Sequence, residues 1–179
     1  MRQIGRGAFR TVFEHPDRPE DWVVKVPRKD VERHGRVMNQ EEARAARLFP
    51  DLFPAVHDPD PDALVVDRAN PVDDLTRYFP SIKRVHRKFP DVDPWVLLRE
   101  ALLLLTGDAP VVDTRKRLGV LRSMLRRVAQ EDPNVLRLRD AVQELEISVK
   151  DICKQNTGVS RRTGRFVLVD ASTMPGFRG

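Results

Sequence analysis

The first third of the chain consists of short apolar runs separated by polar turn segments, a pattern typical of antiparallel strands. Residues 11–13 and 22–26 are two β-rich runs joined by the polar, proline-containing stretch 15–21. Residues 53–57 and 63–67 are a second such pair, separated by a stretch in which Asp and Pro alternate. The pattern therefore predicts two pairs of short strands, with a further strand or its equivalent before the helix that follows residue 27.

A helix is predicted between these two pairs, over residues 30–48. Apolar residues recur in this segment at helical spacing, and Pro50 would end the helix. The expected inward positions are Val31, Met38, Ala45 and Leu48.

The middle of the chain shows the three- and four-residue spacing of apolar side chains that predicts helices. The pair Asp93–Pro94 opens a helix over 95–105, because Asp caps a helix start and Pro suits the first turn. Asp113 is expected to cap a second helix, and the pair Asp132–Pro133 opens a third. The expected inward positions are Leu118, Leu121, Leu125 and Val128 in the second helix and Leu138, Val142 and Leu145 in the third.

Strand character returns near the end, at residues 147–149 and 165–169, with a turn at 161–164. We therefore predict an α+β fold with two lobes. Residues 1–67 would form a small antiparallel β lobe with one helix, and 68–179 a helical lobe that ends in a hairpin.

The composition is that of a soluble globular protein, since 40% of the 179 residues are hydrophobic and 33% are charged. No stretch reaches the roughly 18–20 uncharged apolar residues of a membrane span. The N-terminal residues lack the apolar core of a signal peptide. Cys153 is the single cysteine, which excludes an internal disulfide framework and a Cys-rich zinc site. We expect a cytoplasmic protein with no membrane partner.

The chain is basic, with a net charge of +5, and 25 of its 32 basic residues are arginine. Arginine suits phosphate groups through its planar fork, although a GC-rich genome produces the same excess. A charge of this size, spread along the chain, does not favour nucleic acid as a partner. A solvated face or an acidic partner would explain the basic residues of the second predicted helix: Arg115, Lys116, Arg117, Arg122, Arg126 and Arg127.

A glycine-rich turn lies near the N-terminus, where Gly5 and Gly7 precede the strand that contains Val12. Glycine lets the backbone approach phosphate oxygens without a clash of a Cβ atom. Two glycines also occur in ordinary hairpin turns, and Val12 would lie over an adenine ring or in the core. The turn alone leaves both interpretations open.

Lys25 stands inside the apolar run 23–26, and strand alternation puts it on the same face as Val23. If that face is inward, Lys25 requires a counter-charge, because an unpaired buried ammonium is costly. Glu41 and Glu42 on the following predicted helix are the available partners. A buried Lys–Glu pair below a glycine turn suits triphosphate binding, whereas a lysine on an edge strand would point into water.

Three oxygen-bearing side chains occur late in the chain: Asp151, Asn156 and Asp170. Asp151 and Asn156 lie five residues apart in one segment, and Asp170 ends the last apolar run. Carboxylate and amide oxygens suit Mg²⁺, which is bound by one or two carboxylates plus phosphate oxygens. A second carboxylate provides a base. An ordinary loop turn is the alternative for the Asp-x-x-x-x-Asn spacing.

Taken in this order, these pieces resemble the protein-kinase-like superfamily, whose signature is a Gly-rich loop, a strand lysine, a helix glutamate, an Asp-x-x-x-x-Asn loop and a metal-binding Asp. The resemblance makes residues 1–67 a kinase-like N-lobe, 67–69 the hinge and 68–179 a reduced C-lobe with the catalytic and metal-binding loops. The chain is most similar to minimal Ser/Thr kinase-like proteins of bacteria and their viruses. An Asn-x-x-Glu helix motif recurs in them and selects Glu42, with Asn39, as the partner of Lys25.

The resemblance implies ATP and Mg²⁺ as cofactors, in the cytoplasm of a bacterial cell or a phage-infected host. Lys25 would hold the α- and β-phosphates, with Glu42 fixing its side chain. The other residues that would enclose the nucleotide are Gly5 and Gly7 over the phosphates and Val12 and Val23 around the adenine.

The resemblance also implies the reaction, transfer of the γ-phosphoryl group of ATP to a hydroxyl, with protein Ser/Thr as the expected acceptor. Asp151 would accept or orient the proton of the attacking hydroxyl. Asn156 and Asp170 would hold Mg²⁺. Positioning and electrostatics supply most of such catalysis, so a few residues suffice.

Several positions depart from the family's pattern. Arg10 replaces the third glycine of the loop, where it would stiffen the loop or contact phosphate. Cys153 occupies the place of the usual lysine after Asp151, and Asp170-Ala171-Ser172 stands for Asp-Phe-Gly. The chain continues for only nine residues after Asp170, without an activation segment. These departures leave three alternatives: a minimal kinase, a pseudokinase that binds a protein partner, or part of a longer chain. The oligomeric state stays open.

Overall fold

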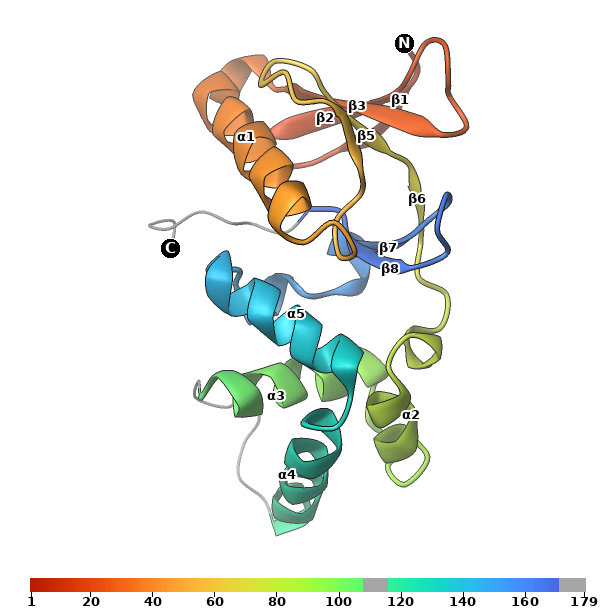
Figure 1. Cartoon of the computed structure of the whole chain (residues 1–179), viewed down its shortest axis with the longest axis vertical. Coiled ribbons are helices and arrows are strands. Elements are labelled where there is room, and N and C mark those ends of the chain that lie inside the picture. Colours follow the sequence, from red (N-terminus) through yellow and green to blue (C-terminus); the bar gives the residue numbers. More distant parts are fainter. Residues whose placement is uncertain (108–115, 171–179) are drawn as a thin grey trace. The chain divides into compact units, whose positions relative to one another are not determined.

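Figure 1 shows a computed structural model of the chain, which describes residues 1–107 and 116–170. Two compact units can be distinguished. The first, here called the sheet unit, comprises Met1–Pro71 and the segment from Gln155 onward, and the second, the helical unit, comprises Val72–Lys154. Each unit is described by itself. The predicted cap Asp113 and the basic residue Arg115 lie outside the described residues. The side chains of Lys116, Arg117 and Leu118 are not described either.

The sheet unit is built on an antiparallel sheet with the strand order β1-β2-β3-β5-β4. The predicted runs are confirmed as strands in all four cases, with shifted ends. The strands are β1 (Gln3–Arg6), β2 (Arg10–Glu14), β3 (Trp22–Pro27), β4 (Val56–Asp58) and β5 (Leu64–Asp67). Phe53, which was expected to begin the strand over 53–57, instead lies buried before β4.

The helix α1 (Glu32–Leu48) follows the short 3-10 helix η1 (Lys29–Val31) and packs against β3, as Figure 1 shows. Met38 and Ala45 are buried as predicted. Leu48 is 45% exposed, so its predicted inward position is wrong, because the helix ends there and the chain turns into the buried Phe49.

A second, smaller sheet in the same unit joins distant parts of the chain in the order β6-β7-β8. Its strands are β6 (Ala69–Asn70), β7 (Thr157–Ser160) and β8 (Phe166–Leu168). The N–H of Leu168 donates to the carbonyl of Leu52 at 2.7 Å. The predicted run 165–169 is therefore confirmed as a strand, and it is held to the first part of the chain.

The strand predicted at 147–149 is wrong, and the strand that pairs with β8 comes later, as β7. The burial of Ile147 and Val149 alternates with exposure of Ser148, as in a strand. The backbone bonds are local, however: Ile147 N donates to Val142 O at 3.0 Å, and Asp151 N to Ser148 O at 2.9 Å. The segment therefore closes α5 and enters the 3-10 helix η3 (Val149–Asp151).

The helical unit confirms the three predicted helices. Its elements are η2 (Leu75–Arg77), α2 (Pro80–His86), α3 (Pro94–Thr106), α4 (Lys116–Ala129), α5 (Pro133–Glu144) and the η3 described above. Asp93 and Asp132 cap as expected, because Asp93 Oδ1 accepts from Trp95 N at 2.7 Å and Asp132 Oδ1 from Asn134 N at 3.0 Å. The described inward predictions are all buried: Leu121, Leu125, Val128, Leu138, Val142 and Leu145.

The fold is thus mixed α/β, with a small antiparallel sheet and, among the described residues, five α-helices. The sequence placed the domain boundary after residue 67 and the segment after 154 in the helical lobe. The compact units divide after Pro71, and Gln155 onward belongs with the sheet unit, since β7 pairs with β6. Over the ranges 1–107 and 116–170, no helix is long and apolar enough to cross a bilayer.

Two helical glycines give opposite predictions for stability. A Cβ on Gly35 would meet Pro27 Cβ at 2.7 Å and the carbonyl oxygen of Phe9 at 2.8 Å, whereas a Cβ on Gly119 meets nothing within 4 Å. We expect Gly35→Ala to lower the free energy of unfolding by about 1–3 kcal/mol through this clash. Gly119→Ala should raise it by about 0.5–1 kcal/mol through helix propensity.

Urea unfolding followed by tryptophan fluorescence checks both values, because Trp22 lies in β3 of the sheet unit and Trp95 in α3 of the helical unit. Replacing the other tryptophan by Phe isolates each signal. A Gly35→Ala protein as stable as the parent would contradict the close approach of α1 to the chain at Pro27.

Candidate functional site

A buried ion pair joins the third strand to the first helix of the sheet unit. Lys25 Nζ on β3 donates to Glu42 Oε1 at 2.6 Å and to Oε2 at 2.8 Å, and both residues are buried. The choice of Glu42 rather than Glu41 as the partner of Lys25 is therefore confirmed. Lys25 also donates to the carbonyl oxygen of Val169, at the end of the described chain.

Asn39 fixes the helix that carries Glu42. It is fully buried, and its Nδ2 donates to the carbonyl of Lys25 at 3.0 Å and to that of Pro61 at 2.7 Å. Residues three apart lie on one face of a helix. Asn39 therefore holds the face of α1 that presents Glu42 to Lys25, which gives the Asn-x-x-Glu motif a structural role.

Arg10 is the central cation of the cluster, although the sequence marked it only as a departure from a glycine. It is 5% exposed, and its Nη1 donates to Glu42 Oε2 at 2.7 Å and to Asn39 Oδ1 at 3.1 Å. Its Nη2 donates to Asp170 Oδ1 at 2.6 Å. Strand alternation contained the signal, because Arg10 lies two residues before Val12, and Val12 stands opposite Lys25.

The charges of this cluster balance, since Lys25 and Arg10 face Glu42 and Asp170. Burial lowers the pKa of Lys25 below its ordinary value, and the neighbouring Arg10 lowers it further, against the attraction of Glu42. Burial also acts to lower the pKa of Arg10, but the carboxylates of Glu42 and Asp170 outweigh it, so this pKa is raised. Arg10 therefore stays charged, and its charge makes Lys25 easier to deprotonate.

The two predicted metal ligands, Asn156 and Asp170, lie together in the sheet unit. The carbonyl of Asn156 accepts from Val169 N at 2.9 Å and from Asp170 N at 3.4 Å. The side chain of Asp170 is 47% exposed and receives Arg10 on one oxygen. The backbones of the two residues are thus adjacent, and the water-facing carboxylate of Asp170 fits Mg²⁺, which keeps several waters and uses few protein ligands.

The glycine-rich turn lies directly against Asp170. Gly7 N donates to Arg10 O at 2.8 Å, which closes the turn, and Arg28 Nη1 donates to Ala8 O at 2.9 Å. A Cβ on Gly7 would lie 3.5 Å from Asp170 Oδ2, an ordinary contact. A Cβ on Gly5 would lie 3.5 Å from Val12 Cβ. Both positions therefore have room for a Cβ in this conformation.

Val12 and Val23, the residues predicted to enclose adenine, belong to one hydrophobic cluster. Val23 is buried in it, and Val12 packs against it while partly exposed. The other members are Ala43, Leu64, Val66 and Val56. The two valines thus share a face of the sheet with Lys25, which was predicted for Val23 only, and their contact with a nucleotide stays a prediction.

Asp151, the predicted catalytic base, belongs to the helical unit. It ends η3, which packs against α3, and its carbonyl accepts from Cys153 N at 2.9 Å. The buried charge cluster is built within the sheet unit. The catalytic role of Asp151 therefore stays a prediction from the order of motifs.

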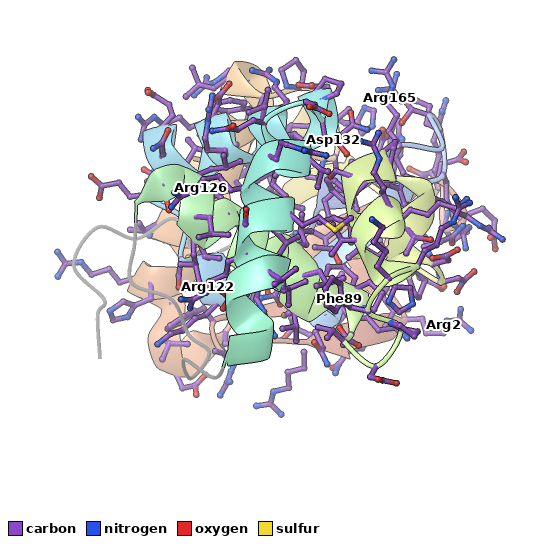
Figure 2. The ribbon with its side chains drawn as sticks, turned by 90° about the horizontal axis from the view of Figure 1, so that it is seen from below. Arg2, Phe89, Arg122, Arg126, Asp132 and Arg165 are labelled. Carbon is purple, nitrogen blue, oxygen red and sulfur yellow. The ribbon has the colours of Figure 1, made fainter. Side chains whose placement is uncertain are left out.

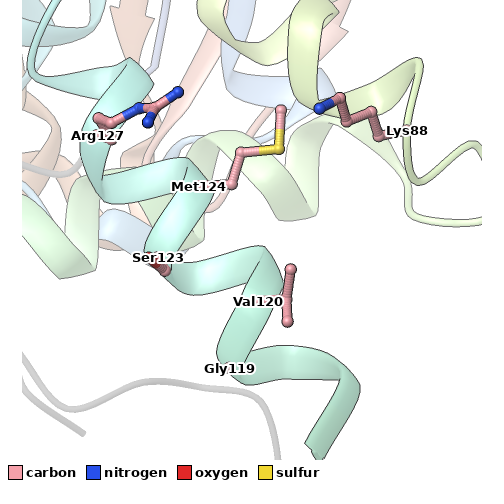
Figure 3. Close-up of a pocket in the computed structure, with 6 residues that line it drawn as sticks. All are labelled: Lys88, Gly119, Val120, Ser123, Met124 and Arg127. Carbon is pink, nitrogen blue, oxygen red and sulfur yellow. The ribbon is translucent and has the colours of Figure 1, made fainter.

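Two cavities of the helical unit lie along α4. One, of about 420 Å³, lies between α4 and the segment after α2, and Figure 3 shows Met124 and Lys88 pointing toward one another there. Arg122 and Arg126, labelled in Figure 2, line a second one of about 510 Å³. The Nε of Arg122 lies 3.8 Å from Glu100 Oε2. Part of the predicted basic face therefore forms an ion pair inside the helical unit.

Among the described residues, no group of three or more His, Cys, Asp or Glu side chains is arranged to hold a metal ion. The Nε2 of His57 lies 2.7 Å from Asp67 Oδ1, within hydrogen-bond distance. The imidazole ring also stacks on Trp22, with 4.2 Å between the ring centroids. The candidate site is therefore the Lys25 cluster.

No family model, no curated protein and no solved structure matches this chain.

Glu42 is expected to be the most costly member of the cluster to remove. Glu42→Gln leaves the cations of Lys25 and Arg10 facing each other in a buried site, and we expect a loss of about 3–5 kcal/mol in the free energy of unfolding. Lys25→Met leaves Glu42 paired with Arg10, so a loss of only about 1–2 kcal/mol is expected.

Urea unfolding of the sheet unit, read by Trp22 fluorescence, measures both losses. Glu32→Gln is the matched control, because Glu32 pairs with Arg36 on the exposed side of the same helix and should change stability by less than about 1 kcal/mol. A greater loss for Lys25→Met than for Glu42→Gln would contradict the shared role of Glu42.

Proposed function

We propose that this protein is a kinase-like phosphotransferase that binds ATP with Mg²⁺ and transfers the γ-phosphoryl group to a hydroxyl, with protein Ser/Thr as the acceptor. One observation carries the proposal. The strand lysine and the helix glutamate form a buried ion pair next to the glycine-rich turn, and Asp170 belongs to the same cluster.

The energetics of the cluster support a functional interpretation. Burying two cations and a carboxylate costs desolvation free energy comparable with their attraction, and hydrophobic residues of similar volume often stabilise a protein as well or better. Buried groups with shifted pKa values gather at functional sites. A fixed ammonium near a glycine turn suits the phosphates of a nucleotide, and Lys25 belongs to the same charge cluster as Asp170, against which Gly7 lies.

Each residue of the proposed site has a stated task. Lys25, oriented by Glu42, binds the α- and β-phosphates, and the turn at Gly5 and Gly7 covers them. Asn156 and Asp170 hold Mg²⁺, which neutralises charge on the phosphates when bound. The acceptor oxygen bonds to the γ-phosphorus while the bond to the bridging oxygen breaks. Asp151 takes the hydroxyl proton, and ADP leaves.

A second candidate is favoured by the contact between Arg10 and Asp170 at 2.6 Å. This ion pair engages the carboxylate that would hold Mg²⁺, and the following residues depart from Asp-Phe-Gly. Such a chain would bind a protein partner as a pseudokinase, with little or no phosphoryl transfer. Partner binding would then survive Lys25→Ala and Asp170→Ala.

Calorimetric titration with ATP tests the nucleotide site. We expect binding that depends on Mg²⁺ and weakens at least tenfold in Asp170→Asn, because the substitution removes the charge that the metal requires. Asp74→Asn is the matched control, since the side chain of Asp74 is also 47% exposed but lies in the helical unit. Absence of binding at millimolar ATP would reject the nucleotide site and direct attention to a protein partner.

Phosphoryl transfer tests the role of Asp151. With casein and a Ser/Thr peptide library as acceptors, we expect Asp151→Asn to lower the rate of ADP formation by about 10²–10⁴-fold, the usual contribution of a general base. ATP affinity should stay unchanged. Asp140→Asn, which changes a half-exposed carboxylate on α5 of the same unit, should keep the parent rate.

Equal turnover in Asp151→Asn and the parent would contradict the catalytic assignment. If the parent binds ATP but transfers nothing to any of these acceptors, the second candidate, a nucleotide-binding pseudokinase, replaces the first.

A further inference from the structure

We infer that Arg10 competes with a divalent cation for the carboxylate of Asp170 and thereby determines when the site takes up metal. The inference rests on the proposed function in one respect, the assignment of Asp170 as a metal ligand. It goes beyond it by giving Arg10, which replaces the third glycine of the family's loop, a specific task.

The geometry places Arg10 as a bridge between two carboxylates. One guanidinium nitrogen donates to Glu42 at 2.7 Å and the other to Asp170 at 2.6 Å. The planar fork of arginine suits such a bridge, whereas the single ammonium of a lysine does not. Arg10 therefore satisfies with its own charge the carboxylate that a metal ion would otherwise neutralise.

The difference in burial shows where the exchange can occur. Arg10 is 5% exposed and Glu42 7%, whereas the side chain of Asp170 is 47% exposed. Water and ions reach Asp170 from outside, while the pair of Arg10 with Glu42 is enclosed. A metal ion thus exchanges for the Arg10 contact at Asp170 and leaves the contact with Glu42 in place.

The charge balance predicts that metal alone binds weakly. A divalent cation at Asp170 would stand close to the buried charges of Arg10 and Lys25, which repel it. A polyphosphate removes this repulsion, because it supplies negative charge to both cations. Metal and nucleotide should therefore bind cooperatively, each raising the affinity for the other.

The bridge also fixes the glycine-rich turn. Arg10 begins β2, and its carbonyl accepts from Gly7 N at 2.8 Å, so its side chain and backbone hold the turn at Asp170 together. Exchange of Asp170 from Arg10 to a metal ion removes the side-chain half of this attachment. The turn is then held by the backbone bond from Gly7 to Arg10 and by Arg28, through the carbonyl of Ala8.

Binding of Mn²⁺ without nucleotide, measured by electron paramagnetic resonance of the free ion, tests the inference on the full chain. We expect Arg10→Met to bind Mn²⁺ at least about tenfold more tightly than the parent, because it removes both the competing contact and a repelling charge. The gain should disappear in Arg10→Met combined with Asp170→Asn. Arg6→Met, at an exposed position of the same hairpin, should leave the affinity unchanged.

Arg10→Lys provides a second variant, which keeps a cation beside Glu42 and so preserves the enclosed charge balance. Its shorter, unforked side chain cannot bridge both carboxylates, so its Mn²⁺ affinity should also exceed that of the parent. Circular dichroism verifies the fold of each variant. Parent affinity in both Arg10 variants, or absence of Mn²⁺ binding in all of them, would overturn the inference.

The outcomes separate this inference from the proposed function. If the Arg10 variants gain Mn²⁺ affinity but neither the parent nor any variant binds ATP, the competition at Asp170 stands and the kinase-like function is rejected. If ATP binds with Mg²⁺ dependence and the Arg10 variants gain nothing, the function stands and the competition is rejected.

Discussion

The sheet unit depends on one buried carboxylate, that of Glu42, which accepts from two cations on neighbouring strands. Lys25 reaches it from β3 and Arg10 from β2, at 2.6–2.8 Å. Without this anion the buried charges of Lys25 and Arg10 would lie close together with only Asp170 as a counter-charge, which costs about 3–5 kcal/mol. The position of Glu42 in turn requires Asn39, which holds α1 to β3, and Gly35, where helix and chain approach too closely for a Cβ.

The same cluster connects parts of the chain that have different tasks in the proposed function. Lys25 contacts the backbone at Val169, and Arg10 contacts Asp170, so the strand lysine, the glycine-rich turn and the metal-ligand segment form one network. A network of this kind responds as a unit, since a ligand that changes one charge changes the partners of the others. In the proposed function, that property would link nucleotide affinity, metal affinity and the position of the turn, and it extends the effect of Arg10 beyond its own position.

Much of the candidate site could be predicted from the sequence, because its parts obey local rules. Alternation placed Lys25 and Val23 on one face, and the Asn-x-x-Glu spacing selected Glu42, whose pairing with Lys25 the structure confirms. The role of Arg10 was not predicted, because comparison with a glycine pattern directed attention to what the residue lacks. Its own contacts depend on Glu42 and Asp170, which lie 32 and 160 residues away along the chain.

By itself, the sequence determined the elements whose causes are local. The caps at Asp93 and Asp132, the apolar spacing of α5 and the first strand pairs follow from side-chain preferences over a few residues. Tertiary structure alone decided that residues 147–149 close a helix rather than form a strand, and that β7 takes their expected place beside β8. A short apolar run becomes a strand only where another backbone is available to pair with it, and β6 supplies that partner to residues 157–160.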